Sequence, residues 1–191
     1  MSYRSGIDYS GTANSQITDW NPGSNSYNYN IWHSMRSPQE REQNTITEEQ
    51  AMQRGLEFGW SKVFESASYG KLSSLTKNTR GAESFGQGIH ALQDAFAHRG
   101  TDHDNHSLVK DQFPSLIKNG MQDFTKALAI TKSAINVHHL MSGNFDMLAE
   151  SKITIYTDGM NADQKKQLLE KVQEFLQNRN KTTVDTSQTL K

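Results

Sequence analysis

The amino-acid sequence predicts an all-α fold, a helical bundle with a long irregular N-terminal loop region. Apolar residues recur with the 3.6-residue period of an α-helix in four long segments, at about residues 47–66, 82–98, 121–141 and 161–178. Helix-capping residues and glycines stand at the ends of several of these segments. Only residues 152–156 alternate polar and apolar side chains in the manner of a strand.

Residues 1–44 form the predicted loop region. They are rich in Gly, Ser, Asn and Tyr, with turn signals at residues 21–23 (Asn-Pro-Gly) and 37–38 (Ser-Pro). Several aromatic residues, among them Trp20 and Trp32, stand between the small polar ones. Because aromatic rings gain free energy on burial, we expect this region to wrap the helical core, residues 45–178.

Capping signals set the expected ends of the long helices. Thr45 and Thr47 are both N-cap candidates for the first helix, and each is followed three residues later by Glu or Gln, as in a capping box. The helix that starts near Met121 is expected to end at residues 142–143 (Ser-Gly), and Asn161 is expected to cap the last helix.

Four other segments give weaker signals. A short helix is expected from Lys71, and a further helix is expected to start near Ser107. Residues 146–157 stay open between helix and strand, because their apolar pattern fits both. The polar residues 181–191 are expected to form a disordered tail.

The length and composition indicate a single domain over residues 1–180. Only 34% of the 191 residues are hydrophobic, but these concentrate between about residues 46 and 176, where they can form a core. The chain has no cysteine, so disulfides and thiolate metal ligands are excluded, and any metal must bind to His, Asp or Glu. The net charge of -1 argues against a broad basic surface for nucleic acid, although not against a nuclease whose metal ions hold the phosphate.

The strongest functional signal is the helix predicted over residues 82–98. His90, Asp94 and His98 lie four residues apart, so they project from nearly the same side of that helix. The helix also carries a separate apolar stripe for the core, which consists of Phe85, Ile89, Leu92 and Phe96. Two imidazoles and a carboxylate that converge in this way predict a divalent-metal site, and nitrogen with oxygen ligands suits zinc.

Ligand-type residues continue past this helix. His106 is predicted as a further metal ligand, and His103 and His139 are additional candidates. Asp102 and Asp104 are either partners that orient histidine ligands or solvated turn residues.

The segment His90-Ala-Leu-Gln-Asp94, entered through Gly86-Gln-Gly88, resembles the zinc-dependent phospholipase C and fungal single-strand nuclease superfamily. The resemblance implies an all-α fold with two or three zinc ions around a His-x-x-x-Asp helix motif. It also implies that an upstream Asp, and a His about fourteen residues after it, share a zinc ion with that motif. Asp19 and His33, which are 14 positions apart, match this pattern, so the resemblance makes both of them metal ligands.

This sequence departs from the superfamily pattern in three places. His98 follows Asp94 by four residues rather than six. The downstream His-x-x-x-acid pair that completes the second zinc site is not evident, and neither is the N-terminal Trp ligand. A similar run, His-Ala-Leu-Gln-Asp-x-(Phe/Tyr)-x-His-x-Gly, also resembles the C-terminal domains of bacterial polymorphic toxins, such as those that follow RHS repeats.

The resemblance implies a zinc-dependent phosphodiester hydrolase in which Asp94 is the bridging and catalytic carboxylate and Asp19 a second catalytic carboxylate. Paired zinc ions neutralise phosphate oxygens and activate water for in-line attack. Trp32 and Arg99 are candidate substrate contacts. The substrate is expected to be a phospholipid headgroup. The alternatives are a nucleic-acid phosphodiester, with bases stacked on aromatic rings, and a non-catalytic metal-stabilised interaction module.

The expected location of the protein follows from the absence of targeting patterns and from the toxin resemblance. No apolar run reaches the length of a transmembrane segment, and the N-terminus lacks a signal-peptide pattern. The toxin resemblance predicts a secreted or delivered bacterial effector, cut from a larger protein and paired with a cognate immunity protein. Without that resemblance, a cytoplasmic protein is expected.

Overall fold

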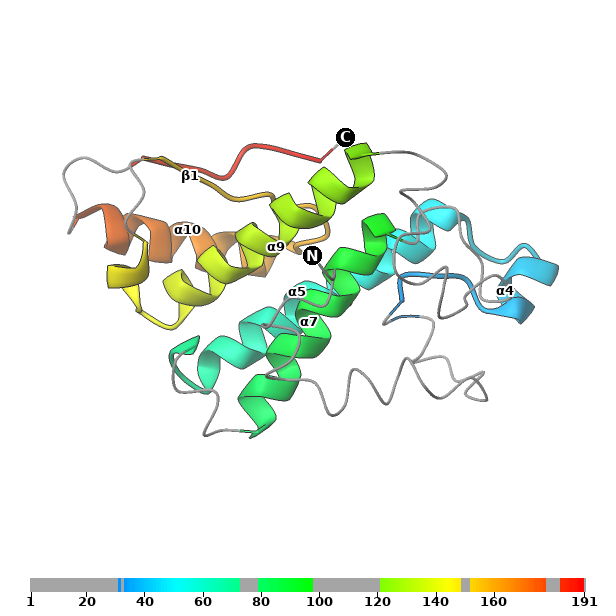
Figure 1. The fold of residues 1–191 in the computed structure, drawn as a ribbon, viewed down its shortest axis with the longest axis horizontal. Coiled ribbons are helices and arrows are strands. Elements are labelled where there is room, and N and C mark those ends of the chain that lie inside the picture. Colours follow the sequence, from blue (N-terminus) through cyan, green and yellow to red (C-terminus); the bar gives the residue numbers. More distant parts are fainter. Residues whose placement is uncertain are drawn as a thin grey trace.

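The computed structural model describes residues 31, 33–72, 79–97, 121–148, 152–177 and 183–190 of the chain. Helices hold 71% of the described residues, which confirms the all-α class. Two helices, α5 and α7, lie side by side along the centre of the molecule, and α9 packs on both of them (Figure 1). Among the described residues, no helix combines the length and the apolar character that a membrane span requires.

Helix α5 (Glu48–Ser68) begins at the predicted capping box, in which Thr47 Oγ1 accepts from the backbone N–H of Gln50. It runs antiparallel to α7 (Thr79–Ala97), and two glycines let the backbones approach each other. A Cβ on Gly88 would lie 2.9 Å from the carbonyl oxygen of Gly59, so only glycine fits at this crossing. The close approach fixes α7, the helix that carries the predicted metal motif.

Helix α9 (Met121–Met141) has the predicted ends and packs antiparallel to α7. Gln93 Nε2 donates to Thr131 Oγ1 at 2.9 Å near one end of the contact, and Phe85 packs edge-on against His138 near the other. The predicted apolar stripe of α7 is fully buried between α5 and α9, which confirms its assignment to the core.

The C-terminal part covers one side of α9. Its elements are the 3-10 helix η2 (Phe145–Met147), strand β1 (Lys152–Thr154), helix α10 (Ala162–Gln177) and strand β2 (Thr183–Asp185). Asn161 caps α10 as predicted, since its Oδ1 accepts from the backbone N–H of Gln164. Residues 146–157, which the sequence left open, thus combine the end of a 3-10 turn with a strand.

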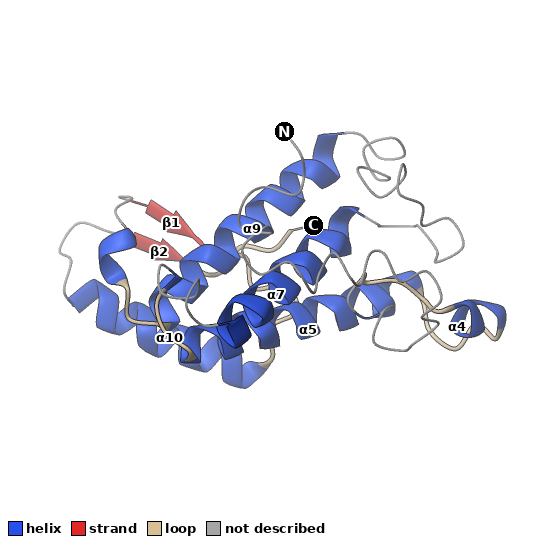
Figure 2. Cartoon of the chain, turned by 60° about the horizontal axis from the view of Figure 1, so that its bottom comes forward, coloured by secondary structure: helices blue, strands red, loops and turns tan. Residues whose placement is uncertain are grey.

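Strand β2 corrects the prediction that residues 181–191 form a disordered tail. It pairs in parallel with β1, with Val184 opposite Ile153 (Figure 2). The pairing continues through the backbone N–H of Ile155, which donates to the carbonyl of Asp185 at 2.8 Å. A polar strand is stabilised here by backbone hydrogen bonds to a segment 31 residues away, a contact that local composition does not reveal.

A short helix, α4 (Pro38–Glu42), corrects the prediction of an irregular region over residues 1–44 for its described part. Ser37 and Glu40 form a capping box, and Pro38 occupies the first turn, where its missing N–H costs nothing. The turn signal at Ser37-Pro38 is therefore a helix start. The helices expected near Ser107 and beyond Leu72 lie outside the described residues.

Candidate metal centre

Helix α7 supplies two of the candidate ligands. His90 and Asp94 lie one turn apart, next to the apolar stripe that α5 and α9 bury. Because the stripe fixes the rotation of α7, the two polar side chains are directed towards the chain segment around His33. The spacing in the sequence therefore places a nitrogen and an oxygen donor together on a rigid element.

The third ligand, His33, comes from a tight turn ahead of α4. The backbone N–H of Ser34 donates to the carbonyl of Ile31 at 3.1 Å, and Ser34 has a φ of 54°, in the left-handed region. Ser34 Oγ donates to the carbonyl of Ala91 at 3.0 Å, so the turn is attached to α7 directly beside His90. This attachment brings His33 next to His90 and Asp94, 57 and 61 residues further along the chain.

Three donor atoms form a small triangle at this place. His33 Nδ1 lies 2.8 Å from Asp94 Oδ2, His90 Nε2 lies 3.2 Å from the same oxygen, and the two nitrogens are 3.3 Å apart. The imidazole rings meet edge to face, with their centroids 4.8 Å apart. Among the described residues, this is the group whose His, Asp and Glu donors lie close enough together to hold a metal ion.

Two edges of the triangle, 3.2 and 3.3 Å long, match the spacing of ligand atoms around one zinc ion, and the third, 2.8 Å long, is shorter. With zinc–ligand bonds of about 2.0–2.1 Å, tetrahedral geometry separates neighbouring ligand atoms by about 3.3 Å. Hydrogen bonds alone explain the triangle less well. Each imidazole nitrogen carries at most one proton, and if both nitrogens donate their protons to Asp94, two donors face each other across the nitrogen–nitrogen edge. The three ligand atoms lie close enough together for a single cation to contact all of them, so the donor set can hold one ion.

The group is buried. The side chains of His33 and Asp94 are each 1% exposed, and that of His90 is 10% exposed. A carboxylate that is removed from water needs a compensating charge, which a divalent cation or a protonated histidine supplies. His90 is therefore the most accessible of the three side chains.

His139 lies apart from this group. It is buried near the C-terminal end of α9, where its Nδ1 lies 3.3 Å from Asn144 Nδ2, and burial lowers its pKa. Its neighbour His138 packs on Phe85, which is nine residues, or roughly 13 Å of helix, before Asp94. The antiparallel packing of α7 and α9 thus puts His139 at the opposite end of α7 from Asp94.

The other predicted site residues lie outside the described residues. They are Asp19, Trp32, His98, Arg99, His103 and His106, together with Asp102 and Asp104. Of the predicted ligands that are described, the structure brings together His33, His90 and Asp94.

Sequence reasoning missed the residues that hold His33 in place. Arg54 donates to the carbonyl of Met35 and to the carboxylate of Glu40, and Gly55 underlies Ser34. Gly55 gave a usable signal, because a glycine inside a good helix costs about 1 kcal/mol and often marks close packing. The capping pattern Ser37-x-x-Glu40 was a second usable signal.

Comparison with known proteins adds no further assignment. No protein-family model, no curated protein sequence and no solved structure is significantly similar to this chain.

Proposed function

We propose that this chain is a zinc-dependent phosphodiester hydrolase, with phospholipase C-like activity. The observation that carries the proposal is the buried triangle of His33 Nδ1, His90 Nε2 and Asp94 Oδ2. Catalytic zinc sites commonly use three protein ligands and keep one further position for water or substrate. The resemblance of the His90–Asp94 segment to zinc-dependent phospholipases and nucleases supports the substrate class, and Asp19 would add a fourth ligand and a catalytic carboxylate.

A bound zinc ion would supply Lewis acidity towards a phosphoryl oxygen and lower the pKa of water towards neutrality. The residues of this chain would prepare that chemistry. His33 and His90 would present neutral nitrogens, and the charge of Asp94 would offset half of the charge of a divalent ion. The buried surroundings would strengthen each of these electrostatic interactions.

The preference for a lipid substrate rests on charge. The chain carries 20 basic and 21 acidic residues, so no excess of positive charge attracts a polyanion. A small headgroup with a single phosphodiester requires no such excess. A second zinc ion belongs to the same proposal, since the resemblance to zinc-dependent phospholipases and nucleases supports it. Delivery as a bacterial toxin and an immunity partner belong to it as well, and the toxin-domain resemblance supports these two.

A second candidate function is a non-catalytic, metal-stabilised interaction module. The burial of the group favours it, because 1% exposure of two of the three ligands is typical of an ion that cross-links the chain. A closed site with four protein ligands would identify this function, and an open position would identify the hydrolase.

The first test is the zinc content of the untagged protein by elemental mass spectrometry, together with hydrolysis of bis(p-nitrophenyl) phosphate, phosphatidylcholine vesicles and single-stranded DNA. We expect at least one zinc per chain and release of a phosphorylated headgroup from the vesicles. Asp94→Asn should lose both metal and activity. Asp158→Asn, which alters a carboxylate that accepts from the backbone of Leu190, should keep both.

Each other outcome decides between the candidates. Cleavage of DNA alone would assign the nuclease activity. Bound zinc without hydrolysis of any diester would assign the interaction module. A protein that neither retains nor takes up zinc would overturn the metal proposal as a whole.

A further inference from the structure

We infer that four residues outside the metal group, Ser34, Glu40, Arg54 and Gly55, form a brace that positions His33 for metal binding. The inference rests on the proposed zinc site. His90 and Asp94 are held by their shared helix, whereas His33 reaches them from a different part of the chain. The affinity of the site therefore depends on what fixes the segment around His33.

Ser34 makes the contact nearest to the ligands. Its hydroxyl donates to the carbonyl of Ala91, a residue whose neighbour in the chain is His90. The bond is buried, and it joins the residue after one ligand to the residue after another. A shift of the turn that carries His33 would have to break this bond, so Ser34 limits the distance between His33 and His90.

Gly55 lets the turn lie close to α5. A Cβ at position 55 would overlap the hydroxyl and the Cβ of Ser34, and it would lie 2.9 Å from the Cα of Ser34. Any other residue at this position would push the turn away from α5. The absence of a side chain at Gly55 thus sets the depth at which His33 enters the bundle.

Arg54 and Glu40 hold the far side of the turn. The two guanidinium nitrogens of Arg54 lie 2.6 and 3.1 Å from the carboxylate oxygens of Glu40, and one of them also donates to the carbonyl of Met35 at 3.0 Å. This forked pairing is geometrically specific. The Arg54 guanidinium lowers the pKa of the Glu40 carboxyl, and Glu40 in turn caps α4 through the backbone N–H of Ser37.

The brace links metal binding to the docking of residues 33–42 on α5 and α7. A ligand held in position before binding loses less conformational entropy when the metal binds. Zinc binding and docking of the segment are coupled, and the coupling free energy is the same in both directions. Docking strengthens zinc binding by the same free energy by which bound zinc stabilises the docked segment. Partners that orient metal ligands typically contribute a factor of about 10–100 to metal affinity.

Ser34→Ala and Arg54→Gln test the inference against matched controls. Ala and Ser tolerate the left-handed φ equally poorly, so Ser34→Ala removes the hydroxyl alone. Ser133→Ala removes another buried hydroxyl, which donates to the carbonyl of Ala129. Lys171→Gln removes an ion pair with Glu174 on α10. Zinc affinity is measured by competition with a chromophoric chelator, and the stability of the metal-free protein by urea unfolding.

We expect both brace variants to bind zinc roughly 10–100-fold more weakly than the unaltered protein, while the controls keep its affinity. The visible spectrum of bound Co²⁺ should change in the brace variants and not in the controls, because ligand geometry and not stability sets that spectrum. Arg54→Lys should recover part of the lost affinity.

The outcomes separate this inference from the proposed function. If the unaltered protein binds no zinc, the proposed metal site fails. If it binds zinc, but Ser34→Ala and Arg54→Gln bind equally well with unchanged Co²⁺ spectra, the brace fails and the metal site stands. Loss of affinity only in proportion to lost stability, in brace and control variants alike, would also overturn the brace.

Discussion

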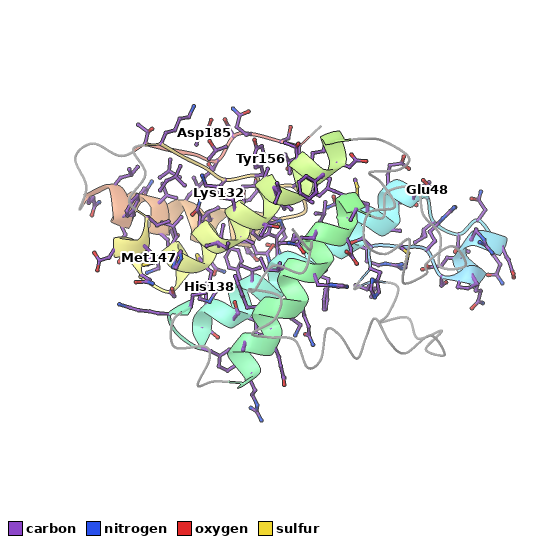
Figure 3. The ribbon with its side chains drawn as sticks, in the orientation of Figure 1. Glu48, Lys132, His138, Met147, Tyr156 and Asp185 are labelled. Carbon is purple, nitrogen blue, oxygen red and sulfur yellow. The ribbon has the colours of Figure 1, made fainter. Side chains whose placement is uncertain are left out.

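At the scale of single residues, His138 is a fully buried imidazole that lies outside the metal group (labelled in Figure 3). Its ring packs edge-on against Phe85 with the centroids 5.0 Å apart, and within the described structure neither ring nitrogen meets a hydrogen-bond partner of standard geometry. Burial, with a smaller contribution from His139, lowers the pKa of His138 to about 4, although the nearby backbone of Ser66 opposes the shift. His138 is therefore neutral in the folded protein at physiological pH.

The lowered pKa of His138 predicts that acid destabilises the folded protein. An unfolded histidine has a pKa of about 6.5, so the unfolded chain takes up a proton at His138 as the pH falls below this value, whereas the folded chain does not until about pH 4. The free energy of unfolding should thus be unaffected by His138 above pH 7 and decrease by up to about 3 kcal/mol towards pH 4. Urea unfolding between pH 8 and pH 4.5 measures this decrease.

The variant His138→Leu supplies the comparison, because leucine fills a similar volume and does not titrate. Its stability should fall less steeply with acidification than that of the unaltered protein. Equal slopes for the two proteins would assign the acid sensitivity to other groups.

At the scale of elements, the crossing of α5 and α7 determines where the metal motif lies. Gly59 and Gly88 form the contact, and the atoms that face Gly88 include the carbonyl oxygen of Gly59 and the backbone nitrogen of Val63. Backbone atoms cannot turn aside as the end of a long side chain can. The two helices can therefore approach each other at this distance only without side chains at the crossing.

Gly88→Ala should destabilise the protein even though alanine favours a helix by about 1 kcal/mol more than glycine. Overpacking against immobile neighbours costs typically about 1–3 kcal/mol, so after the gain in helix propensity we expect a net loss of up to about 2 kcal/mol in the free energy of unfolding. Thermal and urea unfolding would show the loss. Ser61→Ala, at an exposed position of α5, should leave stability nearly unchanged. A Gly88→Ala protein as stable as this control would contradict the claim that backbone packing at the crossing requires glycine.

At the scale of the whole molecule, long-range contacts join segments that precede α5 and follow α9 to the central helices. Trp60, fully buried on α5, donates from Nε1 to the carbonyl of Asp158 at 2.6 Å, which attaches the turn before α10. His33 attaches the segment that precedes α4 to α7. A metal ion at His33, His90 and Asp94 would therefore cross-link segments that are about 60 residues apart in the sequence.

Zinc should stabilise the folded protein accordingly. At a free zinc concentration of 1,000 times the Kd, binding adds about 4 kcal/mol, which for a chain of this size corresponds to an increase of roughly 10 °C in Tm. Differential scanning calorimetry with zinc or with EDTA measures the change. Asp94→Asn should show the same Tm under both conditions, and an unaltered protein with no zinc-dependent Tm would argue against the cross-link.

The sequence alone determined the elements whose signals are local. The starts of α5 and α10 followed from capping residues, the C-terminal end of α9 followed from a glycine, and the apolar stripe of α7 followed from its period. The convergence of His90 and Asp94 followed from helix geometry, because residues four apart share a face whatever the rest of the chain does. The pairing of His33 with them was expected from a resemblance and not from local pattern.

Only the tertiary structure decided the contacts between distant segments. Strand β2 depends on a partner 31 residues away, and the position of His33 depends on Ser34, Arg54 and Gly55, which are scattered over more than 20 residues. Periodicity and capping report what a segment does with its own neighbours. Long-range pairing depends on which surfaces meet after the helices have packed, so it becomes visible only once the chain has folded.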